Sequence, residues 1–147
     1  MARTFDPEAA ARWIADGHAR RATYENLPAE LAPTTVEEAY AAQDALHRLW
    51  EPRLGPLAGR KIATTTKVMQ ALMGIDHPCG GGIFSACVHA APTTLEAADY
   101  TSLMLEFELA VRLSSELPRN TQPWTRATPG GARVAGACVR HAEDDAG

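Results

Sequence analysis

Apolar residues recur at helical spacing in the first third of the chain and at alternating positions further along. Asp6 followed by Pro7 is typical of a helix start and predicts a helix from Asp6 to about residue 21. Thr35, with Glu38 three residues later, predicts the start of a second helix through a capping box. One face of this helix carries Val36, Ala39, Tyr40, Gln43, Leu46, His47 and Trp50. The polar member of the face, a glutamine, is expected to be hydrogen-bonded where it packs.

The pattern changes after this helix, which is predicted to end in a loop containing Pro52, Gly55, Pro56 and Gly59. Residues 60–65 are predicted to form a strand, residues 66–73 a short helix that ends at Gly74, and residues 83–88 a second strand. Three consecutive glycines at 80–82 mark either a turn or a close approach between backbones. Helices followed by strands favour the α+β class.

Residues 103–113 alternate strictly between apolar and other side chains, which predicts a further strand. Its apolar face consists of Leu103, Leu105, Phe107, Leu109, Val111 and Leu113. The other face carries Glu106 and Glu108, about 7 Å apart along the strand. Two carboxylates at that spacing can converge on Mg²⁺ or Mn²⁺, which prefer oxygen ligands. They can equally face water, with Arg112 relieving their repulsion, and the spacing leaves both interpretations open.

Composition limits the class of protein. A chain of 147 residues corresponds to one ordinary domain, and its net charge of −4 argues against binding to nucleic acid or to an anionic membrane. No apolar stretch is long enough to cross a bilayer, and the first residues lack a signal-peptide pattern. Three cysteines without a C-x-x-C pair provide no disulfide framework. We therefore expect a cytoplasmic protein.

Two further groups of residues could carry chemistry. The chain has only two lysines, Lys61 and Lys67, although arginine is common, and lysine suits proton transfer and contact with an oxyanion. A second group has the ligand types of a structural zinc site but not a common zinc spacing. Its members are His77, Cys79, Cys87 and His89. They can also be ordinary loop and packing residues.

Four sequence blocks in a fixed order resemble the 2-keto-4-pentenoate hydratase family of the fumarylacetoacetate hydrolase superfamily. They are residues 37–43 (EEAYAAQ), 59–70 (GRKIATTTKVMQ), 74–78 (GIDHP), and 105–111 with 117–118 (LEFELAV and LP). The second block is similar to the family's G-x-K-I-G-x-T-S, the third to its G-V-D-x-P, and the last to its E-x-E strand. Together the blocks extend over about residues 35–124.

The resemblance implies a metal-dependent hydro-lyase of aromatic catabolism that acts on a small 2-oxo or 2-hydroxydienoate acid. Glu106 and Glu108 would be ligands of Mg²⁺ or Mn²⁺, and Lys61 would be the catalytic cation facing the dienolate. Thr65 and Thr66 would contact the substrate. The implied fold has N-terminal helices followed by part of a mixed β-roll. A complete protein of this kind would be a homo-oligomer.

Departures from the family pattern keep alternatives open. Cys79 stands where better-known hydratases have an aspartate, so a 2-oxo-3-enedioate decarboxylase is the alternative within the family. The family's third carboxylate ligand lies on a later strand that has no match here, so the chain is expected to be truncated. An inactive chain that pairs with a full-length subunit is therefore a further alternative. We expect a helical segment at 1–58, an incomplete catalytic portion at 59–126 and an unmatched tail at 127–147.

Overall fold

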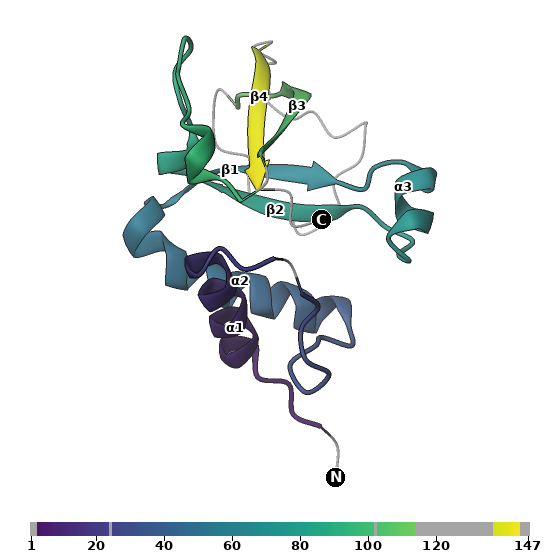
Figure 1. Ribbon diagram of the computed structural model, residues 1–147. Helices are drawn as coiled ribbons and strands as arrows, with labels where there is room; N and C mark the ends of the chain where they lie inside the picture. Colours follow the sequence, from purple (N-terminus) through teal and green to yellow (C-terminus); the bar gives the residue numbers. More distant parts are fainter. Residues whose placement is uncertain (1–2, 24, 102, 114–136, 145–147) are drawn as a thin grey trace. The chain divides into compact units, whose positions relative to one another are not determined.

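A computed structural model describes residues 3–23, 25–101, 103–113 and 137–144 of the chain (Figure 1). The chain divides into two compact units, Met1–Leu95 and Glu96–Ala146. Helices and strands are both present, as the α+β class predicts. The predicted boundary at 58/59 lies inside the first unit, and the boundary at 126/127 lies outside the described residues. Among the described residues, none of the helices combines the length and the apolar character that crossing a membrane requires.

The first helix, α1 (Pro7–Ala19), begins as predicted. The Asp6 carboxylate accepts a hydrogen bond from the backbone N–H of Ala9 at 3.0 Å. Pro7 occupies the first turn, where its missing N–H would have no partner within the helix. The helix ends two residues earlier than predicted, and Arg21 has a left-handed φ of 50°. A residue with that φ does not continue a right-handed helix.

The second helix, α2 (Val36–Leu54), begins at the predicted cap, where Thr35 Oγ1 accepts from the Glu38 N–H at 3.2 Å. The Glu38 carboxylate reaches one residue further back than a capping box requires. It accepts from the Thr34 backbone N–H at 2.7 Å and hydroxyl at 2.9 Å, and pairs with Arg3 at 2.9 Å. The Thr34 N–H is the main reason that the pKa of Glu38 lies below its usual value. The carboxylate thereby ties the preceding segment to the first helical turn.

The prediction that a loop begins at Pro52 is wrong, because α2 continues through Pro52 and ends at Leu54. A proline near the helix end removes one backbone hydrogen bond without preventing the final turn. Gly55 then ends the helix with a φ of 75°, and its N–H donates to the Glu51 carbonyl at 2.8 Å.

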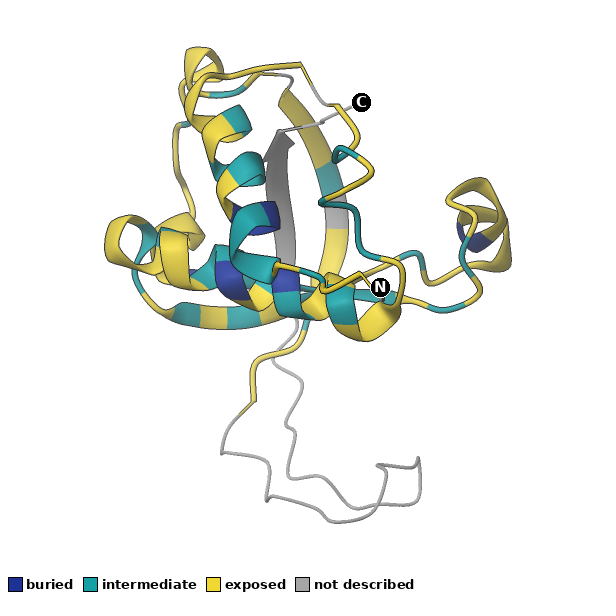
Figure 2. Cartoon of the chain, turned by 90° about the horizontal axis from the view of Figure 1, so that it is seen from below, coloured by how far each residue is buried: buried dark blue, intermediate teal, exposed yellow. Residues whose placement is uncertain are grey.

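The two helices meet through small side chains. Ala10 and Ala11 of α1 and Ala42 and Ala45 of α2 are buried (Figure 2). Alanine leaves little bulk between helices, so their backbones can approach closely. The most buried positions of α2 therefore lie beside the predicted apolar face rather than on it.

An antiparallel hairpin follows, formed by β1 (Leu57–Ala63) and β2 (Cys79–Phe84). Both strands begin earlier in the sequence than predicted. The glycines at 80–82 lie within β2, so the turn interpretation is wrong and the close approach is confirmed. A Cβ atom added at Gly82 would lie 2.6 Å from Leu57 Cδ2 and 2.9 Å from the His47 ring. Only glycine lets α2 and β1 come this close to β2 at that position.

The apolar face of α2 packs on the hairpin, whereas Val36 at the start of the helix is exposed. The rings of His47 and Trp50 lie edge-on to Phe84, with centroid distances of 5.5 and 6.2 Å. Burial lowers the pKa of His47 below its usual value. The Arg60 guanidinium lowers it further, whereas Asp44 acts in the opposite direction. The imidazole is therefore held towards its neutral form.

Two side chains of α2 bond directly to the backbone of β2. Gln43 Nε2 donates to the Gly80 carbonyl, and the Gly80 N–H donates to the Tyr40 hydroxyl, both at 3.0 Å. The prediction that Gln43 is hydrogen-bonded in the packing is confirmed. These bonds and the aromatic contacts fix the hairpin against the helix.

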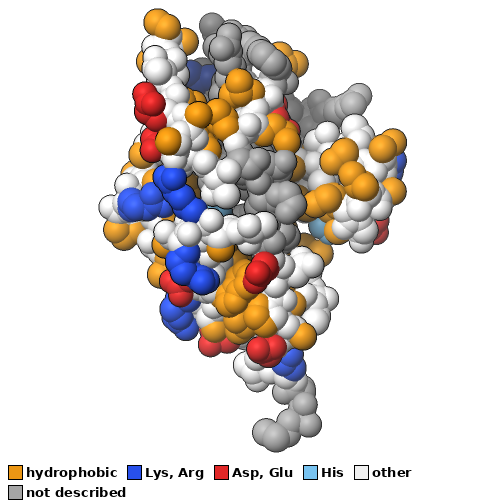
Figure 3. All heavy atoms as spheres, viewed as in Figure 1, with side chains coloured by type: hydrophobic (Ala, Val, Ile, Leu, Met, Phe, Trp, Pro, Cys, Tyr) orange, Lys and Arg blue, Asp and Glu red, His pale blue; other side chains and the backbone are white. Residues whose placement is uncertain are grey.

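Between the strands lies α3 (Lys67–Leu72), which Thr66 caps by accepting from the Met69 N–H at 3.3 Å. Gly74 follows with a φ of 68°, close to the predicted helix end. Hydrophobic side chains gather on the surface of α3 (Figure 3). The exposed ones are Val68, Met69, Leu72 and Met73. After β2, the residues predicted to extend the strand form the 3₁₀ helix η1 (Ser85–Cys87) instead.

The second unit begins with the 3₁₀ helix η2 (Ala97–Asp99) and contains a pair of antiparallel strands, β3 (Leu103–Ala110) and β4 (Ala137–Asp144). The strand predicted over residues 103–113 is confirmed as far as residue 110. Part of the tail predicted to be unmatched pairs along the whole length of β3. Side chains on both faces of β3 are open to solvent. The exposed hydrophobic ones are Leu103, Met104, Leu105 and Leu109.

Candidate functional site

Lys61 lies in β1, on the face of the hairpin that points away from α2. Directly opposite residues of an antiparallel pair share a face, and Lys61 is opposite Gly81. Gly80 and Gly82 alternate with Gly81 and contact α2, so Lys61 projects to the other side. A Cβ atom added at Gly81 would come within 3.2 Å of Lys61 Cγ. The bare glycine therefore makes room for the lysine stem across the strand.

Cys79 shares this face, because it is opposite Ala63, two residues after Lys61. It is half-buried, and its backbone N–H donates to Thr64 Oγ1 at 3.0 Å. Cys79 is thus on the same side of the hairpin as the predicted catalytic lysine.

The turn after β1 carries the predicted substrate-contacting residues Thr65 and Thr66, both exposed. It begins at Thr64, which has a left-handed φ of 54°. This conformation is rare for a β-branched residue and costs on the order of 1–2 kcal/mol. Surrounding contacts must therefore hold it in place.

Gln70 of α3 supplies one of these contacts and is a residue that the sequence analysis missed. It is only 5% exposed, and its Nε2 donates to the Thr64 carbonyl at 3.0 Å. Lys67 Nζ donates to Gln70 Oε1 at 2.9 Å. The sequence does carry one signal for this residue: it is a polar side chain on a short helix whose other residues are mostly apolar.

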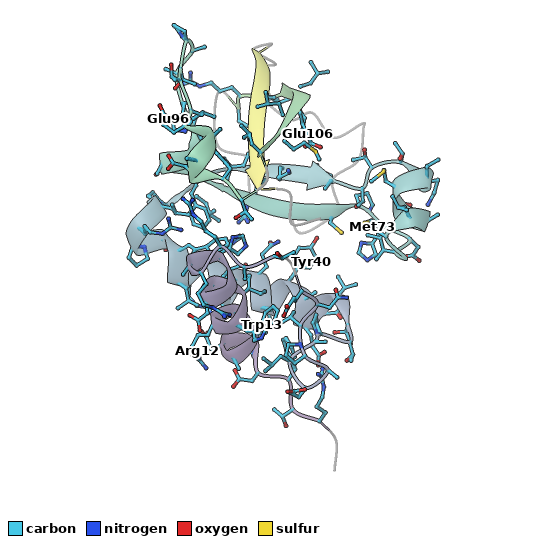
Figure 4. The ribbon with its side chains drawn as sticks, in the orientation of Figure 1. Arg12, Trp13, Tyr40, Met73, Glu96 and Glu106 are labelled. Atoms are coloured by element: carbon cyan, nitrogen blue, oxygen red, sulfur yellow. The ribbon has the colours of Figure 1, made fainter. Side chains whose placement is uncertain are left out.

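Glu106 and Glu108 lie at alternate positions of β3 and so share one face of that strand. Glu106 is half-buried and Glu108 is exposed. Figure 4 shows the Glu106 side chain on β3. In the register with β4, Glu106 is opposite residue 141 and Glu108 is opposite residue 139. The pair offers oxygen donors of the type that Mg²⁺ and Mn²⁺ prefer.

The zinc interpretation is wrong. Among the described residues, no three His, Cys, Asp or Glu side chains come together in a way that could hold a metal ion. Cys79 begins β2 and Cys87 lies beyond its other end, so a whole strand separates them. His77 instead uses its Nδ1 in a 3.0 Å contact with the Pro78 carbonyl.

A cavity of about 660 Å³ lies in the first unit between the start of α2 and the segment that leads into β2. Its lining combines apolar side chains with the polar groups of Tyr40, His77 and Cys79. Lys61, Thr65 and Thr66 are not part of this lining. The predicted catalytic residues and the cavity therefore belong to different parts of the hairpin region.

The predicted site residues fall in both units. Lys61, Thr65 and Thr66 lie close in sequence on β1 and the turn that follows it, in the first unit. Glu106 and Glu108 lie together on β3, in the second unit. Each group is thus assembled locally by its own strand.

The sequence is similar to two curated proteins of Dechloromonas aromatica (strain RCB). It is 31% identical to "2-keto-4-pentenoate hydratase 2" over 111 residues and 30% identical to "2-keto-4-pentenoate hydratase 1" over 110 residues. These matches cover 76% and 75% of this chain, and 42% of the length of each relative. No protein-family model and no solved structure matches the chain. The resemblance to 2-keto-4-pentenoate hydratases is thereby confirmed over three quarters of the chain.

Proposed function

We propose that this chain carries part of a metal-dependent hydratase that acts on a small 2-oxo or 2-hydroxydienoate acid. The observation that carries the proposal is its similarity to two 2-keto-4-pentenoate hydratases over three quarters of its length. The proposed site residues lie on regular elements of the fold: Lys61 on β1, and Glu106 and Glu108 on β3.

Lys61 is proposed to stabilise negative charge on the substrate. An ammonium group is a compact point charge, which suits a carboxylate or the oxygen of a dienolate. Its stem is supported across the strand by Gly81, so the charged end is presented from a fixed base. The hydroxyls of Thr65 and Thr66 would donate hydrogen bonds to the same anionic group.

Glu106 and Glu108 are proposed to hold Mg²⁺ or Mn²⁺. The donor set fits in chemical type, because Mg²⁺ is commonly bound through one or two carboxylates and keeps several waters. The chemistry supplied by such a cation is that of a Lewis acid towards a 2-oxo acid. A cation would also remove the repulsion between two carboxylates on one strand face.

The proposed reaction moves one proton along the conjugated chain and then adds the elements of water across a carbon–carbon double bond. Negative charge develops on the oxygen at C2 while the proton moves, and Lys61 would lower the energy of that state. The hydroxyls of the turn would keep the carboxylate end of the substrate in place during both steps.

Decarboxylation is the second candidate, and Cys79 is the observation that favours it. This half-buried thiol lies on the Lys61 face of the hairpin, where the better-known hydratases have an aspartate that handles protons. Comparing carbon dioxide release from a 2-oxo-3-enedioate with water addition to a 2-hydroxydienoate separates the two reactions.

Titration with Mn²⁺, followed by the paramagnetic relaxation of water, tests the metal site. We expect the unsubstituted chain to bind Mn²⁺ and the Glu106→Gln/Glu108→Gln variant to bind it at least tenfold more weakly. Glu96→Gln/Asp99→Asn is the matched control, because it removes two carboxylates from the same unit away from β3. Equal titrations for the chain and the Glu106/Glu108 variant would contradict the metal assignment.

Substitution of Lys61 tests the catalytic role. Lys61→Met should lower kcat for hydration on the order of 10²-fold and leave the Mn²⁺ titration unchanged, because the lost interaction belongs to the transition state. Arg60→Met is the control, since it removes a cation from the opposite face of the same strand. Equal kcat values for Lys61→Met and the parent chain would rule out this role.

A further inference from the structure

The turn that carries Thr65 and Thr66 is held by side chains. Thr64 Oγ1 accepts from the Cys79 N–H at 3.0 Å and donates to the Ala63 carbonyl at 2.7 Å. The Thr64 carbonyl accepts from Gln70 at 3.0 Å. A β-branched residue keeps a left-handed φ only where several contacts fix it, and such residues concentrate at functional sites.

The backbone and side-chain polar groups of Gln70 are all hydrogen-bonded to this part of the chain. Its backbone N–H donates to the Thr66 carbonyl, and its carbonyl accepts from the Ile75 N–H, each at 2.9 Å. Its side chain bonds to Thr64 at one end and to Lys67 at the other. Among the residues whose burial the structure describes, it is also the single buried polar residue. A buried amide with all of these partners is rigid.

Lys67 determines which way the Gln70 amide points. An ammonium group only donates hydrogen bonds, so it must face the amide oxygen Oε1. The amide nitrogen is then directed at the Thr64 carbonyl, which only accepts. The Lys67 side chain is exposed, but its charged end has this defined partner.

We propose that Gln70, oriented by Lys67, is a positioning residue that holds the strained turn at Thr64 so that Thr65 and Thr66 present their hydroxyls to the substrate carboxylate. This role rests on the proposed function. Thr66 can serve in this way while capping α3, because a hydroxyl that accepts from the Met69 N–H still has its own hydrogen to donate.

The test combines a structural and a binding measurement on the complete chain. Gln70→Glu keeps the shape of the side chain and an acceptor for Lys67, but it cannot donate to the Thr64 carbonyl. We expect the Cys79 amide, whose acceptor is Thr64 Oγ1, to exchange its hydrogen at least tenfold faster. We also expect at least fivefold weaker binding of 2-oxopentanoate, a saturated substrate analogue, in the presence of Mg²⁺, with the Mn²⁺ titration unchanged.

Two comparisons separate positioning from a general structural effect. Lys67→Met should weaken 2-oxopentanoate binding, and Lys67→Arg should restore it to within twofold of the parent, because arginine also donates to the amide oxygen. Gln43→Glu removes the same type of bond, from an amide to the Gly80 carbonyl, on the α2 side of the hairpin. It should leave 2-oxopentanoate binding within twofold.

The outcomes separate the positioning role from the proposed function. If Gln70→Glu speeds the exchange of the Cys79 amide but leaves 2-oxopentanoate binding unchanged, the positioning role is overturned and the proposed function is not. Unchanged exchange in this variant would have the same meaning. Equal weakening by Gln43→Glu and Gln70→Glu would reduce Gln70 to a structural residue. If the unsubstituted chain does not bind 2-oxopentanoate, the proposed function fails, and the role of the turn in substrate binding fails with it.

Discussion

His47 lies where α2 comes closest to β2, against Gly82 and edge-on to Phe84. Burial and the Arg60 guanidinium both favour its neutral form, so its pKa in the folded chain lies below the value of about 6.5 expected when unfolded. Between those two values the unfolded chain binds more protons than the folded chain. Folding is therefore opposed as the pH falls through that range.

We therefore predict that His47 makes the stability of the folded chain depend on pH. Above about pH 7.5 the imidazole is neutral in both the folded and the unfolded chain, so it should not make the free energy of unfolding depend on pH. As the pH drops from about 7 to 5, the free energy of unfolding should fall. His47→Gln should flatten this part of the curve, as urea unfolding at several pH values would measure. His89→Gln, at an exposed loop position, should keep the slope of the parent chain. A slope that survives in His47→Gln would assign the effect to another group.

At single residues, sequence reasoning succeeded where the rule is local. The caps at Asp6 and Thr35 follow from short-range hydrogen bonding within one helical turn, and both are present. The contacts of Gln70 and Lys67 were not predictable in this way. They depend on the left-handed φ of Thr64, which brings a carbonyl of the turn under α3. No sequence pattern indicates a strained conformation at a threonine.

The elements themselves were predicted more reliably than their ends. Hydrophobic periodicity located α2 and β3, and β-branched residues followed by the glycine at 74 located β1 and α3, but tertiary contacts moved the boundaries. A side chain at Gly82 would collide with His47 of α2 and Leu57 of β1, and one at Gly81 would meet the Lys61 stem on the other face of the hairpin. The pairing of β3 with β4 was missed because it joins segments that are far apart in sequence. Whether the two carboxylates of β3 bind a metal stays a prediction.

The hairpin predicts effects of different size for two glycine substitutions. Gly82→Ala should lower the free energy of unfolding by about 1–3 kcal/mol, because its Cβ would lie within 3 Å of Leu57 and His47. Gly59→Ala, in the partner strand, should change it by less than about 1 kcal/mol, because the nearest atom to its Cβ would be 3.8 Å away. Urea unfolding of both variants measures the difference. Equal losses would show that glycine is needed at both positions for another reason.

At the scale of the whole chain, the main feature is the amount of apolar surface open to solvent. On β3, Leu109 is 92% exposed, and Leu105 is 53% exposed. On α3, Val68 and Leu72 are both more than 70% exposed. Exposed apolar strand faces of this kind promote association.

We therefore predict concentration-dependent self-association that the β3 leucines promote. Leu105→Thr/Leu109→Thr keeps residues that favour strands and should reduce the association measured by sedimentation velocity. Val88→Thr, which removes one exposed apolar side chain from the loop after η1, should leave it unchanged. Unchanged sedimentation of the double variant would show that β3 does not contribute.

The two bonds from α2 to Gly80 also restrict how the β1–β2 sheet can be extended. In an antiparallel pair, the N–H and C=O of one residue point to the same side. Both groups of Gly80 bond to Tyr40 and Gln43, so they point away from β1, to the outer edge of β2. The helix therefore occupies the hydrogen-bonding positions that an additional strand would need there. A further strand that joins this sheet therefore cannot pair with β2 at Gly80.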